Sequence, residues 1–223
     1  MPLNIAMDGP VGAGKSSIAD AVAARLGILH LDTGAMYRAV GLSALNAGVD
    51  INDEQAVTDF ANRVAISVRY EQGGQRTLVD GEDVTSFLRT ERVSMAASRV
   101  ATYGGVRRAM VSIQQHLAAQ TDMLVDGRDI CVRVLPNAPV KIFLTASPEE
   151  RARRRFLELQ KKGTSDTYEQ VLEDLKKRDA QDMGRAVDPL RPTEDAVIVD
   201  TTGIPFDGVV DRILQIVEEK YHG

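Results

Sequence analysis

The residues best suited to chemistry lie near the amino terminus, in the segment Asp8-Gly-Pro-Val-Gly-Ala-Gly-Lys-Ser16. Its spacing is Gly-x-x-x-x-Gly-Lys-Ser, with a short apolar strand predicted before it and a helix from Ser17 to Leu26 predicted after it. Glycines let successive backbone N–H groups surround a polyphosphate, and the helix start adds the positive end of its dipole. Lys15 supplies a point charge for the outer phosphates, and the Ser16 hydroxyl suits Mg²⁺. This context disfavours an ordinary glycine-rich turn and predicts a nucleoside triphosphate site at Gly9, Pro10, Val11, Gly12, Ala13, Gly14, Lys15, Ser16 and Ser17.

Two groups of arginines could supply the fixed positive charge that phosphoryl transfer needs. Arg151, Arg154 and Arg155 have the spacing that places side chains on one helix face. Arg178, Asp182 and Arg185 follow on the next predicted helix, where the carboxylate can hold both guanidinium groups. The alternative is a solvated helix face with weak surface ion pairs. We favour anion binding, because no matching acids are expected around the first group.

A second candidate binding segment is Asp32-Thr-Gly-Ala-Met-Tyr-Arg38, which follows a short apolar run. Thr33, Tyr37 and Arg38 suit a smaller phosphorylated ligand, because Arg38 can hold a phosphate through two parallel hydrogen bonds. The alternatives are that Thr33 is a helix cap and Tyr37 a core residue.

The segment Asp126-Gly-Arg-Asp129 ends another apolar strand. Asp126 is positioned to orient a magnesium shell, and Asp129 could accept from the exocyclic amine of cytosine. An Arg–Asp pair that stabilises the loop is an equally good interpretation on these residues alone.

Five short apolar runs alternate with helical patterns, which predicts an α/β protein with a five-stranded parallel sheet flanked by helices. Ligands of such sheets gather beyond the carboxyl ends of the strands. Residues 65–81 break the alternation and predict an inserted β-hairpin with a turn at Gly73-Gly74. Ser147-Pro-Glu-Glu150 predicts a capping box opening the arginine-bearing helix, and a further helix is expected from about Tyr168 to Met183.

Length and composition limit the remaining possibilities. A chain of 223 residues buries one good core. Its formal charge of −5 argues against a nucleic-acid polymer as partner. The single cysteine, Cys131, fits a reducing compartment. Because we find neither a signal-peptide pattern nor a membrane-length apolar run, we expect a cytoplasmic protein without membrane contact, and by default a monomer.

These motifs together resemble bacterial cytidylate kinase, a family of nucleoside monophosphate kinases. Besides the three segments above, Pro-Val-Lys-Ile-Phe-Leu and Gly-Arg-Ala-Val occur in the family's order, so the resemblance covers nearly the full length. It implies transfer of the γ-phosphoryl group of ATP to CMP or dCMP with Mg²⁺. It also implies a P-loop kinase fold as a single kinase unit over 1–223. The expected parts are a core of 1–39, 97–147 and 166–223, a monophosphate-binding lobe with the hairpin at 40–96, and a short lid at 148–165.

The resemblance also assigns site residues. Arg178 and Arg185, with the lid arginines Arg151 and Arg155, would surround the transferring group. They would join Lys15 of the phosphate loop and the metal ligands Ser16 and Asp126, which the motifs themselves predict. One departure is Cys131-Val132, where the family has Gly-Thr. If that glycine takes positive φ, Cys131 would strain the turn and shift Asp129. The acceptor contacts that the resemblance implies are Thr33, Arg38, Ser98, Arg107, Arg128, Asp129, Arg178, Asp182 and Arg185, and Tyr37 is added from its own segment.

Two alternatives stay open. A kinase for another small phosphate acceptor would share the same loop and arginines. A nucleotide-dependent switch would share the loop, but the chain lacks an Asn-Lys-x-Asp motif for reading guanine. The sequence does not rank CMP, dCMP and UMP.

Overall fold

The computed structural model describes residues 2–71, 74–161 and 163–221. The chain divides into two compact units, residues 1–2 with 29–123 and residues 3–28 with 124–223. We call them the first and the second unit. Residues 72–73, which include part of the predicted hairpin turn, lie outside the described residues.

The principal sheet has five strands, as the sequence predicts, and their order is β2-β6-β1-β7-β8. β1 runs parallel to β7, with Ile5 opposite Val140, and β7 runs parallel to β8, with Ile142 opposite Val197. Because β6, β1 and β7 are almost wholly buried, their sequences are continuous apolar runs rather than alternating ones. The strands are β1 (Asn4–Asp8), β2 (Leu29–Asp32), β6 (Met123–Gly127), β7 (Val140–Thr145) and β8 (Val197–Asp200).

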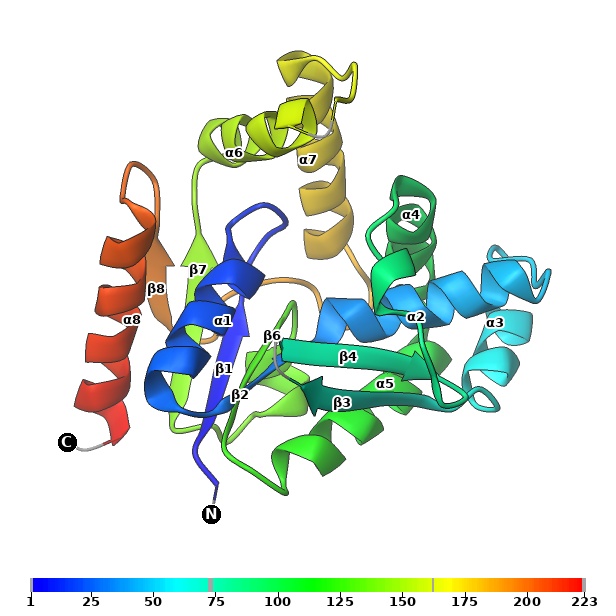
Figure 1. Cartoon of the computed structure of the whole chain (residues 1–223), viewed down its shortest axis with the longest axis horizontal. Helices are drawn as coiled ribbons and strands as arrows, with labels where there is room; N and C mark the ends of the chain where they lie inside the picture. Colours follow the sequence, from blue (N-terminus) through cyan, green and yellow to red (C-terminus); the bar gives the residue numbers. More distant parts are fainter. Residues whose placement is uncertain (1, 72–73, 162, 222–223) are drawn as a thin grey trace. The chain divides into compact units, whose positions relative to one another are not determined.

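The core of the second unit lies between its strands and two helices, α1 (Lys15–Leu26) and α8 (Phe206–Tyr221). Ile18 and Val22 of α1 pack in one cluster with Ile213 of α8 and with the strand residues Met7 and Ile142. Figure 1 shows the two helices side by side along β1, β7 and β8. This packing fixes the start of α1 and therefore the loop before it.

A smaller apolar cluster joins α6 (Pro148–Lys161) to α7 (Tyr168–Met183), both also in the second unit. Ala152 of α6 packs with Val171 and Leu175 of α7, and Val11 of the phosphate loop contacts the same cluster. The predicted helix from Tyr168 to Met183 is confirmed. Between β6 and β7 the chain forms a π-helical turn, η2 (Ile130–Val134).

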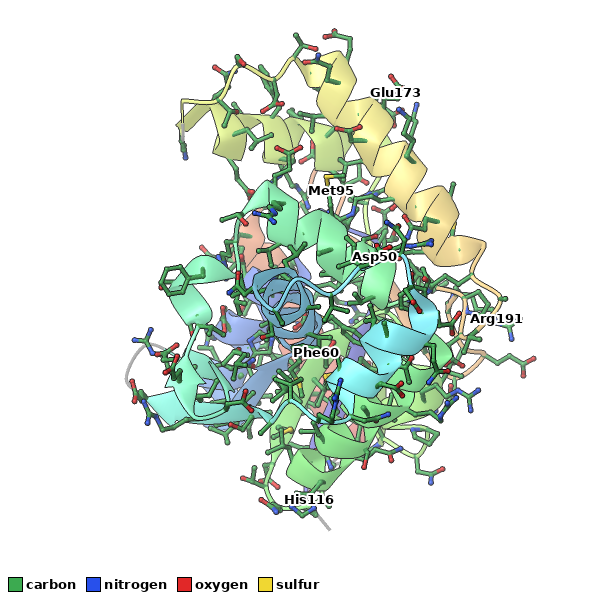
Figure 2. The ribbon with its side chains drawn as sticks, turned by 90° about the vertical axis from the view of Figure 1, so that its right-hand side faces the viewer. Asp50, Phe60, Met95, His116, Glu173 and Arg191 are labelled. Carbon is green, nitrogen blue, oxygen red and sulfur yellow. The ribbon has the colours of Figure 1, made fainter. Side chains whose placement is uncertain are left out.

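The first unit contains the predicted hairpin insertion. β3 (Ile66–Glu71) pairs antiparallel with β4 (Gly74–Val79), which pairs with the short β5 (Glu82–Asp83), so the hairpin is confirmed. In Figure 2 Phe60 marks α3 and Met95 marks α4. The helices of this unit are α2 (Thr33–Asn46), α3 (Glu54–Ala61), the 3-10 turn η1 (Thr85–Phe87), α4 (Glu91–Val100) and α5 (Gly104–Ala118).

Two local predictions need correction. α1 begins at Lys15 rather than Ser17, so Lys15 and Ser16 belong to the first helical turn. The capping box at Ser147 is half formed: Glu150 donates its N–H to Ser147 Oγ over 3.2 Å, but the Ser147 N–H donates to Thr202. The division into core, lobe and lid stays a prediction. Within the described ranges, no helix combines the length and apolar character needed to span a bilayer.

Candidate active site

The phosphate loop connects β1 to α1 in the second unit. Gly12 and Gly14 have φ of 75° and 89°, in the left-handed region that favours glycine. Gly9 is required for a different reason, because a Cβ there would lie 2.0 Å from the carbonyl oxygen of Leu144 in β7. The loop therefore starts in direct contact with the neighbouring strand, and its turn presents the first N–H groups of α1 to a ligand.

The Lys15 side chain lies buried at the base of this loop. Its Nζ donates to the carbonyl oxygen of Pro10 over 2.8 Å, so the side chain folds back along the loop. The pKa of Lys15 is lowered to about 7, mainly by burial and to a smaller extent by repulsion from Arg128, whereas Asp126 and Asp8 act in the opposite direction. An anionic ligand would favour the charged ammonium.

The two predicted metal ligands lie together. Ser16 Oγ donates to Asp126 Oδ2 over 3.0 Å, although 110 residues separate them in sequence. Among the described residues no group of three or more His, Cys, Asp and Glu side chains is arranged to hold a metal. Mg²⁺ in nucleotide sites takes one or two protein oxygens and completes its shell with phosphate and water. This hydroxyl–carboxylate pair fits that requirement.

Asp8, at the carboxyl end of β1, accepts two backbone hydrogen bonds from η2. The N–H groups of Ile130 and Cys131 reach its two carboxylate oxygens over 2.8 and 2.9 Å. Burial raises the pKa of Asp8 to about 6, while the two backbone donors oppose this shift. The carboxylate thus fixes the turn that follows Asp129.

The expected strain at Cys131 is wrong. The only described non-glycine residues with positive φ are Asp80 and Asp188, so Cys131 occupies an ordinary backbone conformation in η2. Its thiol is buried, and burial raises its pKa, so this side chain is an inert packing group. Asp129 is also buried, immediately before this turn.

The set of Arg178, Asp182 and Arg185 predicted on one helix does not form as expected. Asp182 accepts from Arg128 Nε over 2.9 Å, which joins α7 to the segment after β6. α7 ends at Met183, so Arg185 lies beyond the helix, where it donates to the carbonyl oxygen of Asp188. The prediction that one helix carries Arg178, Asp182 and Arg185 is therefore wrong for Arg185.

The arginines of α6 do not form a cluster of unpaired positive charges, because Arg151, Arg154 and Arg155 each pair with a carboxylate. Arg151 is buried, pairs with Asp179 of α7 over 2.7 Å and donates to the carbonyl oxygen of Val11 over 3.0 Å. Arg155 forms an exposed pair with Glu158 over 3.2 Å. Arg154 donates to Glu150 and to Thr201. The expectation that no matching acids surround these arginines is wrong.

The first unit carries the other predicted binding residues. Arg38 NH2 pairs with Asp32 Oδ2 over 2.7 Å, and Asp32 also caps α2 by accepting from the Ala35 N–H. Thr33 is the first residue of α2, so the cap is Asp32 and not Thr33. Tyr37 is buried on the same helix. Ser98 lies on α4, and Arg107 is buried on α5 with one donor on the Ala101 carbonyl.

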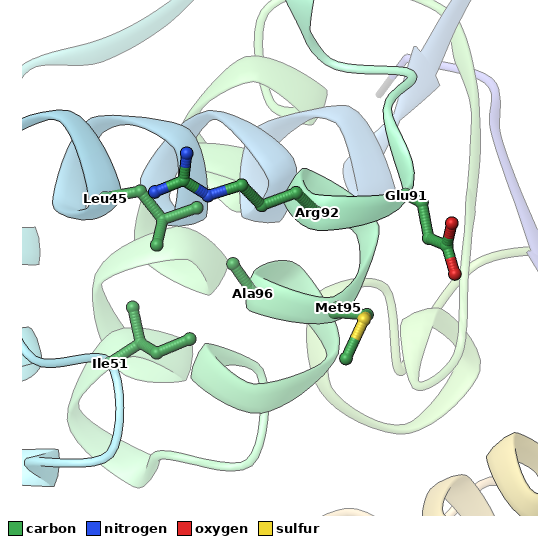
Figure 3. Close-up of a pocket in the computed structure, with 6 residues that line it drawn as sticks. All are labelled: Leu45, Ile51, Glu91, Arg92, Met95 and Ala96. Carbon is green, nitrogen blue, oxygen red and sulfur yellow. The ribbon is translucent and has the colours of Figure 1, made fainter.

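A separate surface pocket of about 420 Å³ lies in the first unit, between the end of α2 and α4. Figure 3 shows the lining side chains, with Leu45 and Ile51 apolar and Arg92 along one side. None of the predicted site residues belongs to the lining set, which is Leu45, Ile51, Glu91, Arg92, Met95 and Ala96.

Comparison with known proteins decides the family. The model of the cytidylate kinase family matches residues 5–219. The chain belongs to the cytidylate kinase family. A cytidylate kinase of Caldicellulosiruptor bescii is 48% identical over 214 residues, with 96% of this chain and 95% of that protein covered. One of Bacillus licheniformis is 48% identical over 219 residues, with 98% and 97% covered. The resemblance found in the motifs is thus confirmed.

The fold class is confirmed by a solved structure of low sequence identity. Shikimate kinase from Bacteroides thetaiotaomicron is similar with a TM-score of 0.51 at 11% identity, with 97% of this chain and 98% of that chain covered. At this identity the similarity concerns the fold alone. It agrees with a P-loop kinase fold in a cytidylate kinase family member.

Sequence reasoning missed Asp8 and Asp179. Asp8 directly follows the apolar run of β1, which is the same signal that singled out Asp126, so it could have been found. Asp179 gave no such signal, because its partner Arg151 comes from another helix.

Proposed function

We propose that this protein transfers the γ-phosphoryl group of ATP to CMP or dCMP, giving ADP and CDP or dCDP. The observation that carries the proposal is the family match over residues 5–219, in a chain whose phosphate loop is complete. The reaction needs little covalent chemistry from the protein and depends on positioning and on neutralising negative charge.

ATP would bind through the phosphate loop, from Gly9 to Ser17. The loop glycines and the start of α1 would direct backbone N–H groups at the phosphates. Lys15 would exchange its contact with the Pro10 carbonyl for an oxygen of the outer phosphates. Because a nearby anion favours the ammonium form, ATP would also restore the full charge of this lysine.

Ser16 and Asp126 would hold Mg²⁺, directly or through water. At this position a bound Mg²⁺ would supply positive charge to offset that of the phosphates. The hydrogen bond between the two side chains supports this role, because it brings a hydroxyl and a carboxylate to one point beside the loop.

The residues proposed to bind CMP or dCMP are those that the motifs and the family resemblance assign. Arg38 would hold the acceptor phosphate together with Arg128, and Asp129 would accept from the cytosine amine. The Arg128–Asp182 pair supports the placement of Arg128, because the carboxylate restricts the guanidinium while leaving other donors available. The further acceptor contacts would be Thr33, Tyr37, Ser98, Arg107, Arg178, Asp182 and Arg185.

The lid proposed at 148–165 would bring further positive charge. Arg155 is the better placed to move, because its exposed pair with Glu158 is weak and can exchange for a phosphate. Arg151 would act from a fixed position, since Asp179 and the Val11 carbonyl hold it against the loop. Lid closure would exclude water and suppress hydrolysis of ATP. Arg178 and Arg185 would complete the charge around the transferring group.

We also propose a cytoplasmic monomer. The lone, buried cysteine suits a reducing compartment.

A coupled assay that follows ADP, with ATP and a panel of monophosphates, tests the function. We expect ADP formation to depend on added CMP or dCMP and to be slower with UMP or AMP. Activity with a different acceptor would favour another small-molecule kinase. ATP consumption that is independent of every acceptor would favour a nucleotide-dependent switch.

A further inference from the structure

The hairpin insertion is attached to the Asp32 segment by one side chain, Gln75 of β4. Gln75 Oε1 accepts from the backbone N–H of Asp32 over 2.8 Å, and Gln75 Nε2 donates to the Asp32 carbonyl oxygen over 3.3 Å. A single amide therefore engages both backbone groups of one residue. These two hydrogen bonds fix both the position and the orientation of the Asp32 backbone, whereas a single hydrogen bond would leave it free to rotate.

The residue so held is the one that positions Arg38. Asp32 Oδ1 accepts from the Ala35 N–H over 2.9 Å, and Asp32 Oδ2 accepts from Arg38 over 2.7 Å. Gly34 allows this arrangement, because a Cβ there would lie 3.0 Å from Asp32 Oδ1 and 3.1 Å from Arg38 NH1. Asp32 thus holds the guanidinium across the first turn of α2.

Gln75 is in turn held by the hairpin. Its Nε2 also donates to Thr77 Oγ1 over 3.1 Å, and the Thr77 N–H donates to Thr85 Oγ1 over 2.9 Å. Thr77 is fully buried. The chain of contacts therefore runs from the hairpin through Gln75 and Asp32 to Arg38, wholly within the first unit.

Arg38 keeps hydrogen-bonding capacity for a ligand. About a quarter of its side-chain surface is exposed, and within the described part of the chain its Nε is buried without a hydrogen-bond partner. A guanidinium carries five donors. A held guanidinium loses less conformational freedom when a phosphate binds, so fixing it raises affinity.

We propose that Gln75 is a positioning residue for the acceptor nucleotide, acting through Asp32 on Arg38. The proposal rests on the function inferred above, in which Arg38 holds the acceptor phosphate. It gives the hairpin insertion a role in acceptor affinity and none in ATP affinity.

Steady-state kinetics of Gln75→Met, which keeps the side-chain length and removes both polar groups, tests this role. We expect the KM for CMP to rise about tenfold, the factor that corresponds to 1.4 kcal/mol and lies in the range of one lost hydrogen bond. The KM for ATP and kcat should change less than about twofold. A general loss of structure would change these two parameters as well, so their constancy shows that the effect is confined to the acceptor. Arg76→Ala, on the same strand but paired with Glu71, and Gln55→Ala, on α3, should leave all three parameters unchanged.

A double-mutant cycle with Arg38→Ala tests the route. If Gln75 acts through Arg38, the tenfold effect of Gln75→Met should largely disappear once Arg38 is removed. An effect of equal size in both backgrounds would overturn the proposal, as would an unchanged KM for CMP in Gln75→Met.

A second variant covers the case in which Gln75→Met does not fold. Thr77→Val is nearly isosteric and removes only the hydroxyl that accepts from Gln75, so we expect a rise of about threefold in the KM for CMP. Without that rise the proposal fails. A wild-type protein that does not phosphorylate CMP would instead reject the function itself, which keeps the two failures distinct.

Discussion

Binding of ATP should draw a proton from solution at alkaline pH, because the charge state of Lys15 changes. In the free protein burial lowers the pKa of Lys15 to about 7 from an ordinary value of 10.5. At pH 8 a group with that pKa is only about 10% protonated. A polyphosphate beside the ammonium raises the pKa again and makes the group almost fully charged. The expected uptake is therefore about 0.9 proton for each ATP bound at pH 8.

The sign of the pH dependence follows from the same shift. Below pH 7 the lysine of the free protein already carries its proton, so the contribution of Lys15 to proton uptake at pH 6 should fall to about 0.1 proton. Apparent ATP affinity should consequently weaken as the pH rises above 7, because binding then requires protonation.

Isothermal titration calorimetry with ATP and no acceptor measures this uptake. At pH 8 the observed enthalpy, plotted against the ionisation enthalpy of several buffers, has a slope equal to the number of protons taken up. Lys176→Met, which removes a half-exposed ammonium on α7, should keep the slope. A wild-type slope near zero at pH 8 would refute the reasoning, and so would an undiminished slope in Lys15→Met.

Three further predictions concern single carboxylates. Asp179→Ala leaves the buried guanidinium of Arg151 unpaired, and we expect the free energy of unfolding measured with urea to fall by about 3–5 kcal/mol; a loss below 1 kcal/mol would contradict this. Asp126→Asn should raise the Mg²⁺ concentration for half-maximal activity, whereas Asp207→Asn in the first turn of α8 should not; equal Mg²⁺ titrations would argue against the metal role. Asp129→Ala should reduce discrimination for cytosine by about 1–3 kcal/mol, seen as converging kcat/KM values for CMP and UMP, and unchanged ratios would remove Asp129 as the base reader.

The elements that carry a local signal could be predicted from sequence. The phosphate loop, the parallel strands and the hairpin each depend on residues within one short segment, where glycine position or apolar periodicity decides the conformation. The same holds for α7, whose bounds were predicted correctly. The first residue of α1 is less accurately predicted. The glycines before it carry no apolar side chains, so hydrophobic periodicity does not show where the helix begins.

Partners from distant segments could not be predicted. Helical spacing places Arg151 and Arg155 on related faces of α6, but it does not reveal that Asp179 of α7 reaches one of them. In the same way, the prediction of strain at Cys131 assumed that the turn requires a residue with positive φ at this position. The turn is instead held by Asp8, more than 120 residues earlier in the sequence.

The burial of Cys131 has a practical consequence for experiments on this protein. Its thiol is the only one in the chain, and its raised pKa keeps it in the unreactive thiol form. A cysteine introduced at an exposed position would therefore be the sole target of a maleimide dye. Fluorescence measurements of substrate-induced movement thus become possible without first replacing the native residue.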